Sequence, residues 1–432
     1  MEFIGECSFF MMENTVKSLR MEQKKPFCAY LYDLPKLRNH VHKLTTSLPS
    51  VSRLFYAIKA NSDETLLRTL APIVHGFEVA SLGEIEKVRA VDKDIPILFG
   101  GPGKTQDEIE GAIDHTVTLI NVESLHELQL VNYIASQKGT TVDILLRVNL
   151  RSSVPNARLK MAGVPTQFGI DEFNIRNAIL LAKSLLNITL RGFHFHAMSN
   201  NLDSKAHAEF VGRCFELSKT WEENFALDIS YLNVGGGIGI NYQDIENQFN
   251  WMDFMDRLNK VLAKHKETNW KVLFECGRYI TSSCGHYAVE VLDIKQNHGE
   301  YFCIVRGGSH QLRLPAAWKQ SHPFTIIPIE KWSYPFIRPE INEAVVTVAG
   351  ELCTPNDILA RNINVPSLRA GDILLFSYVG AYGWAISHHD FLSHPHPDHY
   401  YIEADTISGS GSKMEASNKS DSTPAEGMPE TK

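Results

Sequence analysis

Lys59 is the residue of this sequence with the clearest chemical potential, because it closes a β-prone apolar run, residues 54–58. A lysine at the end of a buried strand has two interpretations. Its side chain can lie along apolar surface while the amine stays in water. Alternatively, the amine stands in a desolvated pocket, where its pKa falls and it can form a Schiff base with a carbonyl compound. The stretch alone slightly favours the first interpretation, and the rest of the chain favours the second.

Polar residues and glycines also follow the later apolar runs. Each of them, taken singly, has an ordinary structural explanation, such as a hydrogen-bonded histidine or a tight glycine turn. Their shared position at the ends of runs is difficult to produce by accident. These residues are Glu78, Ser81, Arg147, Asn149, His194, His196, Ser199, Gly235, Gly236, Gly237, Glu275, Cys276, Gly277 and Arg278.

Eight apolar runs that alternate with helical segments would position these residues. Strands that alternate with helices pair in parallel through right-handed crossovers. Eight regular units favour a closed (β/α)8 TIM-like barrel over an open doubly wound sheet, and the functional residues of such barrels lie at the carboxyl ends of the strands. The runs are 54–59, 76–80, 95–99, 117–121, 142–149, 189–197, 229–234 and 271–275.

The sequence beyond residue 276 has a different rhythm. Runs such as 301–306 and 373–378 lack long helices between them, which predicts a second, antiparallel β domain of barrel or sandwich type. Residues 1–25 are weakly patterned, so we expect them at the surface. The predicted division is a barrel at 33–276, a β domain at 26–32 and 277–405, and a disordered tail at 406–432.

Composition excludes several classes of protein. The 432 residues carry a formal net charge of −8 and no basic block, which argues against nucleic-acid binding. Neither an apolar run long enough for a membrane span nor a signal-peptide pattern is present. The seven cysteines are scattered and form no C-x-x-C pair, so we expect no disulfide framework or zinc site and a cytoplasmic location.

Three further motifs carry weaker signals. The Gly235–Gly237 turn does not fit the dinucleotide fingerprint G-x-G-x-x-G, and the segment 100–105 fails the P-loop pattern because Leu98 stands where a glycine is needed. The histidine-rich run 388–399 is interrupted by prolines and lacks a ligand spacing typical of metal sites. We therefore expect no metal, and a structural or substrate-side role for these histidines.

An ordered set of motifs resembles one enzyme family. Tyr56-Ala57-Ile58-Lys59-Ala60-Asn61, His194-Phe195-His196, the Gly235–Gly237 turn, Glu275-Cys276-Gly277-Arg278-Tyr279, Cys353 with Asp357, and Gly380-Ala381-Tyr382 occur in this order. Together they resemble the ornithine/diaminopimelate/arginine decarboxylases, which share the alanine-racemase-like fold class and use pyridoxal 5′-phosphate (PLP). The resemblance covers roughly residues 28–403 and implies a PLP-binding barrel, a β domain and a head-to-tail homodimer with shared active sites.

The resemblance also implies the role of each residue. Lys59 would hold PLP through its aldehyde, and Glu275 would keep the ring nitrogen protonated so that the ring acts as an electron sink. His196 would stack on the ring, and Cys353 would donate a proton from the partner subunit. His194 is expected only to support this site. The remaining cofactor-binding residues would be Glu78, Arg147, Ser199, Gly235, Gly236, Gly237, Gly277, Arg278 and Tyr382.

Departures from the family pattern bear on the substrate. Family members that act on ornithine carry an acid after the strand at 301–305, where this chain has Arg306. Arg306, His310 and Arg313 predict a basic distal pocket for a polyanionic substrate, and Asp357 is a further expected substrate contact. Stretches including 76–81, 194–203 and 387–397 resemble the family branch of staphyloferrin B siderophore biosynthesis, which decarboxylates a citryl conjugate of 2,3-diaminopropionate. The alternatives are diaminopimelate or ornithine decarboxylation, a PLP racemase, and a non-catalytic PLP-binding protein.

Overall fold

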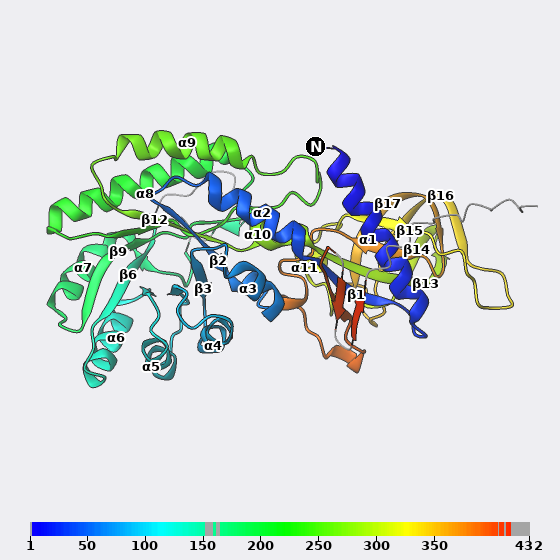
Figure 1. Cartoon of the computed structure of the whole chain (residues 1–432), viewed down its shortest axis with the longest axis horizontal. Helices are drawn as coiled ribbons and strands as arrows, with labels where there is room; N and C mark the ends of the chain where they lie inside the picture. The colour runs from blue at the N-terminus through cyan, green and yellow to red at the C-terminus, as the bar shows by residue number, and fades with distance from the viewer. Residues whose placement is uncertain (1, 152–158, 161–164, 405, 410–411, 416–432) are drawn as a thin grey trace, which may run out of the picture.

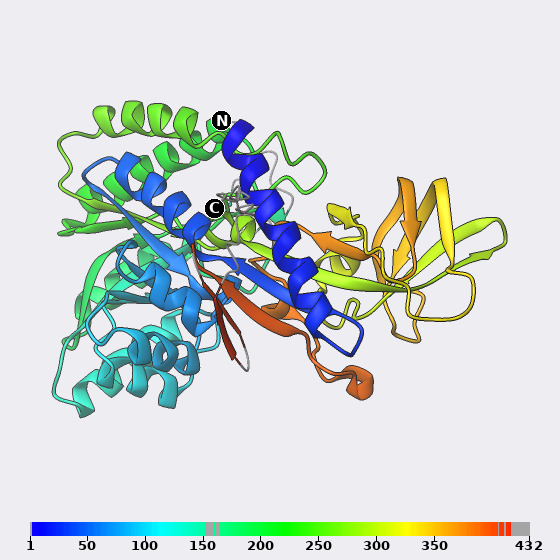
Figure 2. The same ribbon diagram turned by 45° about the vertical axis from the view of Figure 1, so that its right-hand side comes forward.

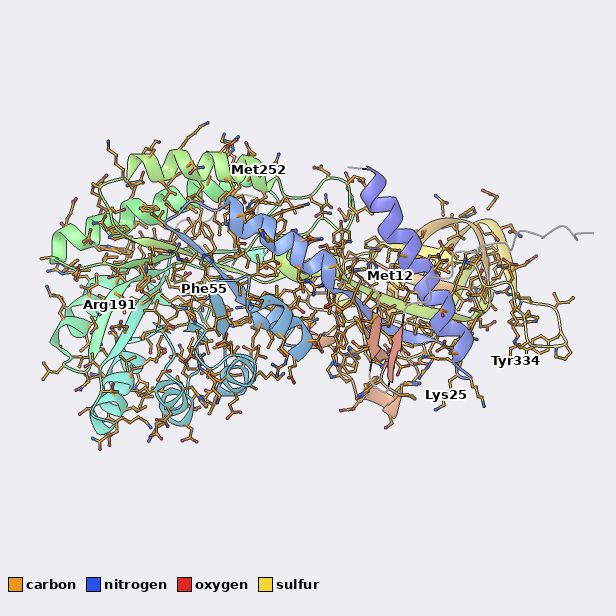
Figure 3. The ribbon with its side chains drawn as sticks, viewed as in Figure 1. Met12, Lys25, Phe55, Arg191, Met252 and Tyr334 are labelled. Atoms are coloured by element: carbon orange, nitrogen blue, oxygen red, sulfur yellow. The ribbon has the colours of Figure 1, made fainter. Side chains whose placement is uncertain are left out.

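The computed structural model describes residues 2–151, 159–160, 165–404, 406–409 and 412–415. Two bodies lie side by side along the long axis, a barrel wrapped by helices and a β domain (Figure 1). Phe55 and Arg191 mark the barrel, whereas Tyr334 lies at the end of the β domain that is farthest from it (Figure 3). Among the described helices, none is long and apolar enough to cross a membrane.

The first body is a closed barrel of eight parallel strands, as the sequence predicts. Each strand pairs with the next along the chain, and β12 pairs with β2 to close the ring through Val272 and Ser52. The strands are β2 (Ser52–Ala57), β3 (Gly76–Val79), β4 (Ile97–Phe99), β5 (Leu119–Val122), β6 (Val142–Asn149), β9 (Ile188–His194), β11 (Tyr231–Asn233) and β12 (Lys271–Cys276).

One irregularity in the barrel depends on a glycine. The pairing of β6 with β9 shifts register after Ile144, and Gly192 of β9 has a φ of 150°. A Cβ at Gly192 would lie 1.9 Å from the carbonyl oxygen of Tyr231, so the neighbouring strand approaches closely only because no side chain is present.

Helices cover the outside of the barrel (Figure 1), and polar caps set where several begin. The Ser81 side chain accepts from the backbone N–H of Glu84 and starts α4, and Thr105 forms a capping box with Glu108 at α5. The covering helices are α2 (Leu34–Ser47), α3 (Glu64–Leu70), α4 (Leu82–Val91), α5 (Gln106–Asp114), α6 (Leu125–Gln137), α7 (Ile175–Ser184), α8 (Ser204–Phe225) and α9 (Trp251–Lys264).

The β domain is built on a mixed sheet. Most pairings are antiparallel, but β1 pairs with β19 in parallel, and so does β14 with β16. The early strand β1 joins β13 of the domain, as expected. The strands are β1 (Cys28–Asp33), β13 (Gly285–Asn297), β14 (Glu300–Val305), β15 (Phe324–Ile327), β16 (Glu340–Ala349), β17 (Ile358–Arg369), β18 (Ile373–Phe376) and β19 (Asp398–Ile402).

Both ends of the chain differ from the sequence prediction. The weakly patterned N-terminus forms a helix, α1 (Glu2–Glu22), that lies across the β domain (Figures 1 and 2). Its Met12, Val16 and Leu19 are buried in a cluster with apolar residues of the sheet. These three positions lie on one helical face, although the helix as a whole is only weakly amphipathic, which explains why the sequence pattern missed it.

The expected tail begins with ordered strands. β20 (Thr406–Gly409) pairs antiparallel with β19, and β21 (Ser412–Glu415) pairs with β20. The prediction of disorder from residue 406 is therefore wrong for these eight residues, because pairing to an existing sheet edge orders a polar segment that composition alone marks as disordered. The rest of the predicted tail, 416–432, lies outside the described residues.

Candidate active site

Lys59 lies just past β2, in a single 3-10 turn, Ile58–Ala60. Its Nζ is 3.0 and 2.8 Å from the two carboxylate oxygens of Glu78 on β3. The Lys59 side chain is 41% exposed, although the Glu78 side chain and the flanking residues Ile58 and Ala60 are buried. The amine is thus held by a buried acid and remains accessible from the mouth of the barrel.

The charge state of Lys59 differs from the sequence expectation. Burial lowers the pKa of the amine, but the charges of Glu78, Tyr382 and Glu275 outweigh burial, so the pKa is raised. The expectation of a lowered pKa is wrong because the sequence did not show that Glu78 pairs with this amine. Lys59 must give up a proton before it can attack an aldehyde.

Glu275 of β12 is fully enclosed at the same end of the barrel. Its Oε1 accepts a hydrogen bond of 2.7 Å from Nδ2 of Asn233 and one of 3.3 Å from Nδ2 of Asn121. Its Oε2 lies 3.2 Å from Nε2 of His194 and 3.9 Å from Nδ1 of His196. Sequence reasoning missed both asparagines, although each belongs to a barrel strand end and the rule that selected Glu275 would have found them.

These contacts fix the charges around Glu275. Burial raises the pKa of its carboxyl, but His194, His196 and Lys59 lower the pKa by more. The pKa of Glu275 therefore lies well below its usual range. Burial also lowers the pKa of His196, and the positive charges of Lys59 and Arg147 add to this effect. At neutral pH the site therefore presents an ionised carboxylate next to a neutral imidazole.

The Gly235–Gly237 turn lies against these side chains. Gly235 and Gly237 have φ values of 67° and 96°. A Cβ on Gly236 would lie 2.0 Å from the carbonyl oxygen of Glu275, and the Gly236 N–H is 3.2 Å from Nδ1 of His196. Only glycine allows this close approach of the backbone. In the free chain the N–H groups of Gly235 and Gly236 donate to Asn233 Oδ1 and His196 Nδ1.

Arg278 begins α10 (Arg278–Thr281), and its guanidinium lies between two aromatic rings. Its Cζ is 4.5 Å from the ring centres of both Trp318 and Tyr382, and its Nη1 donates to Tyr242 Oη at 2.9 Å. The Tyr382 backbone N–H donates to the carbonyl of Ala60 at 2.8 Å. The β domain thus attaches to the turn that carries Lys59. Trp318 and Tyr242 were missed because a sequence does not show which rings stack on a cation.

Arg147 is held by an ion pair at the barrel mouth, whereas Ser199 lies on a short strand. Arg147 is buried, pairs with Glu123 at 2.6 Å and lies over the ring of Phe168, with 4.7 Å between Cζ and the ring centre. Ser199 lies on β10 (Met198–Ser199), which pairs with β7 (Leu159–Lys160). Glu123, which the sequence analysis did not select, also accepts from the backbone N–H groups of Gly101 and Gly169. It ties three loops of the barrel mouth together.

In the β domain, the expected basic pocket contains an acid. Arg306 forms an ion pair with Glu351, whose Oε1 also lies 3.8 Å from Nε2 of His310. The sequence analysis predicted Arg306 as a basic group of this pocket, and here its charge is paired with that of Glu351. Arg313 is exposed, and its backbone N–H donates to Ser387. Glu351 lies two residues before Cys353 in the chain, and the sequence reasoning missed it.

Asp357 and Cys353 also differ in their surroundings. The Asp357 carboxylate is buried and accepts from the backbone N–H groups of Ser309 (2.6 Å) and Leu352 (2.9 Å). Its oxygens thus hold two loops of this chain together, which differs from the expected contact with substrate. Cys353, by contrast, is exposed on the single chain.

The cluster at the barrel mouth suits PLP. An accessible amine lies beside a buried acid, a second acid is ionised and buried, and the Gly235–Gly237 turn keeps the backbone bare of side chains. Ligand atoms of His194, His196 and Glu275 also lie within 4.8 Å of one another, a spacing that a metal ion could use. The amine of Lys59 is not one of these three ligand groups, and it is the group that an aldehyde cofactor requires.

Comparison with known proteins identifies the family. The family model for the pyridoxal-dependent decarboxylases, pyridoxal binding domain, matches residues 34–282, which is more than half of the chain. This chain belongs to the pyridoxal-dependent decarboxylases. It is therefore a PLP-dependent decarboxylase, and the barrel is its cofactor-binding body.

Several relatives cover nearly the whole chain. The 2-[(L-alanin-3-ylcarbamoyl)methyl]-2-hydroxybutanedioate decarboxylase of Staphylococcus aureus is 46% identical over 380 residues, 88% of this chain and 95% of the relative. The L-glutamyl-[BtrI acyl-carrier protein] decarboxylase of Niallia circulans is 30% identical over 390 residues, 88% of this chain and 90% of the relative. The crystal structure of Helicobacter pylori diaminopimelate decarboxylase complexed with L-lysine is 27% identical, with a TM-score of 0.81, and the match covers 91% of this chain and 95% of that one.

Proposed function

We propose that this enzyme decarboxylates the amino-acid head of a citryl conjugate of 2,3-diaminopropionate in carboxylate siderophore biosynthesis. The observation that carries the proposal is the 46% identity to the Staphylococcus aureus enzyme, whose name describes such a conjugate. That compound carries two carboxylates and a hydroxyl on its citryl part and a third carboxylate on its amino-acid part. The enzyme must therefore remove one carboxylate and tolerate the other two.

At the barrel mouth, the residues would act on the amino-acid part. Lys59 would hold PLP, Glu275 would keep the ring nitrogen protonated, and neutral His196 would lie against the ring. When bound, PLP supplies an electron sink for the electron pair released as the carboxylate departs as CO2. Glu78 holds the Lys59 amine at the barrel mouth in the free enzyme and so fixes the position of the atom that must bind the cofactor.

The phosphate of the cofactor would be bound by the Gly235–Gly237 turn, with Ser199, Gly277, Arg278 and Tyr382 around it. Two features support this assignment. The turn consists of glycines, and a Cβ on Gly236 would collide with the backbone carbonyl of Glu275. The Arg278 guanidinium is held in place by the rings of Trp318 and Tyr382. Backbone N–H groups and a fixed guanidinium are typical partners of a phosphate.

Cys353 would return a proton to the carbon that lost the carboxylate, from the partner subunit of a head-to-tail homodimer. Its exposure on the single chain supports this role, because a thiol that serves a partner's site must project from its own surface. The enzyme would work in the cytoplasm, where a reducing environment keeps this thiol free.

The citryl part would contact Arg306, His310 and Arg313. His310 is fully buried, and neither ring nitrogen has a hydrogen-bond partner among the described residues. Burial lowers the pKa of His310 to about 4, so the ring is neutral and offers one donor and one acceptor. A buried ring without partners carries a desolvation cost, which a substrate hydroxyl or carboxylate would offset when its entry displaces the groups that enclose the ring.

The test is CO2 release by the PLP-loaded enzyme. The citryl conjugate of 2,3-diaminopropionate is compared with meso-diaminopimelate, L-ornithine and L-lysine at equal concentration. The proposal expects a kcat/KM for the conjugate that exceeds the others by at least about a hundredfold. Equal or faster release from a free diamino acid contradicts it.

Diaminopimelate decarboxylation is the second candidate, and one observation favours it. Glu351 places a carboxylate beside Arg306, so the distal pocket carries no net excess of fixed positive charge from this pair. A pair of opposite charges can accept the ammonium and carboxylate of the far end of diaminopimelate. The same CO2 assay separates the two candidates.

A further inference from the structure

We propose that Glu351 is a positioning residue that links the Cys353 loop to the Arg306 turn, so that the proton donor and the distal pocket are set together. This inference rests on the proposed role of Cys353 as proton donor. It does not depend on which substrate the enzyme uses.

Four groups converge on one oxygen of Glu351. Oε1 forms an ion pair with Arg306 and accepts the backbone N–H of Gly307 at 3.0 Å. The same oxygen lies 3.5 Å from Nδ1 of His394 and 3.8 Å from Nε2 of His310. The Glu351 side chain is only 12% exposed, so these contacts are little screened by water.

The backbone joins the same two segments. The Glu351 N–H donates to the Gly307 carbonyl at 2.9 Å, and a Cβ on Gly350 would lie 2.5 Å from Cα of Gly308. Asp357 binds the backbone N–H groups of Ser309 and Leu352, one from each segment. Since Cys353 follows Leu352 directly, the position of the thiol depends on this set of contacts.

The Glu351 carboxylate beside Arg306 is better explained by holding the two segments together than by binding substrate. The enzyme's substrates are amino acids that carry at least one carboxylate, and a fixed negative charge near the pocket opposes the binding of further anions. Arg306 could attract a substrate carboxylate without Glu351. Cys353 lies two positions after Glu351 in the chain, so the contacts that hold Glu351 against the Arg306 turn also constrain where the thiol lies.

The experiment compares Glu351→Gln with Glu290→Gln in the PLP-loaded dimeric enzyme. Glu290 is a matched control, because it is a buried β-domain carboxylate that also accepts a backbone N–H, that of Phe27 at 2.7 Å, and pairs with Arg20 at 2.8 Å. It lies on β13, and its backbone carbonyl accepts the Arg306 N–H at 2.9 Å, a contact that the Glu290→Gln variant keeps. The measurements are CO2 release, amine formation and thermal unfolding, with whichever substrate the wild-type enzyme turns over.

For Glu351→Gln we expect a fall of roughly tenfold to a hundredfold in the rate of amine formation, because the proton donor moves out of line. The ratio of amine formed to CO2 released should also fall below that of the wild type. Glu290→Gln should lower the unfolding temperature while the ratio stays at the wild-type value. A merely structural role for Glu351 predicts equal ratios in both variants and would overturn the inference.

Arg306→Gln keeps the inference testable if Glu351→Gln is poorly folded, because it breaks the same ion pair from the other side and should lower the same ratio of amine to CO2. Where both single variants fold, a cycle measures the link directly. Arg306→Gln and the double variant complete a cycle with Glu351→Gln. If the two side chains act as one unit, the double variant loses no more amine formation than the worse single variant. Fully additive losses contradict the link. If the wild-type enzyme prefers a free diamino acid, the proposed citryl substrate is wrong. The ratio of amine to CO2 can still be measured with that diamino acid, so the role of Glu351 is tested separately.

Discussion

The barrel mouth and the Cys353 region of the β domain differ in how their acids are used. At the barrel mouth, Glu275 and Glu78 face groups that a cofactor can replace or engage, and Lys59 remains 41% exposed between them. In the β domain, Glu351 and Asp357 are occupied by groups of the same chain, namely Arg306 and backbone N–H groups. The first set is arranged to receive a ligand, and the second is arranged to hold loops.

The comparison predicts that barrel variants lose the cofactor, whereas β-domain variants lose a later step. Lys59→Ala should show the largest effect, a fall of about a thousandfold or more in CO2 release together with loss of bound PLP. Lys59→Arg keeps the positive charge beside Glu78 but cannot form a covalent link to an aldehyde, so it should be almost as inactive. The check is PLP absorbance after gel filtration, and retention of covalently bound PLP by Lys59→Ala would contradict the assignment.

Cys353→Ser should give the next largest effect, about a hundredfold in amine formation, because a hydroxyl is a far weaker acid than a thiol. PLP content and absorbance should match those of the wild type, because serine is close to cysteine in size and Lys59 and the other proposed cofactor-binding residues are unchanged. Steady-state kinetics and PLP titration on the same preparation measure both quantities. Loss of PLP from this variant would remove the distinction between the two regions.

The barrel could be predicted in detail because its signals are local. Runs of buried residues with period two or none mark parallel strands, and the polar residues that follow them collect at one rim. Asn121 and Asn233 follow the same logic and were within reach. The direction of the Lys59 pKa shift could not be predicted, because it depends on Glu78. This residue is distant in the sequence and comes within 2.8 Å of the Lys59 amine only when β2 and β3 pair.

The β domain was less predictable because its contacts join distant segments. The pairing of Arg306 with Glu351 spans 45 residues, and Asp357 accepts from Ser309 across 48. α1 depends on three buried residues that pack against the sheet, and β20 depends on an existing sheet edge. In each case tertiary structure supplies the partner, so composition and periodicity contain no signal.

Gly236→Ala tests how tightly the barrel mouth is built. The new Cβ would lie 2.0 Å from the Glu275 carbonyl, so the turn must shift and PLP affinity should fall roughly tenfold to a hundredfold. Gly83→Ala is the matched control, because nothing lies within 4 Å of its Cβ and alanine favours helix α4. PLP titration measures both, and equal affinities would show that the turn takes no part in binding.

The smallest predicted effect is a pH dependence of stability that both regions share. Burial lowers the pKa of His207 in α8 and of His322 in the β domain to about 4 each, below the unfolded value of about 6.5. The unfolded chain therefore binds more protons between these values. The free energy of unfolding should fall as pH drops from about 6.5 to about 4, and should be flat above this range as far as these groups are concerned.

Chemical denaturation of the wild type, His207→Phe and His322→Phe across that range measures the effect. Each variant should show a shallower pH dependence than the wild type, because one buried neutral imidazole no longer has to become charged. An unchanged slope in both variants would place the acid sensitivity in other groups.

The most direct test of the central claim, a site shared between one barrel and the β domain of a partner, is subunit mixing. Lys59→Ala and Cys353→Ser homodimers are mixed in equal amounts under conditions where labelled wild-type subunits are seen to exchange, and CO2 release and amine formation are followed. The account predicts recovery to about a quarter of wild-type activity, because half of the dimers are mixed and each mixed dimer has one site with both residues intact. Proven exchange without recovery would contradict it.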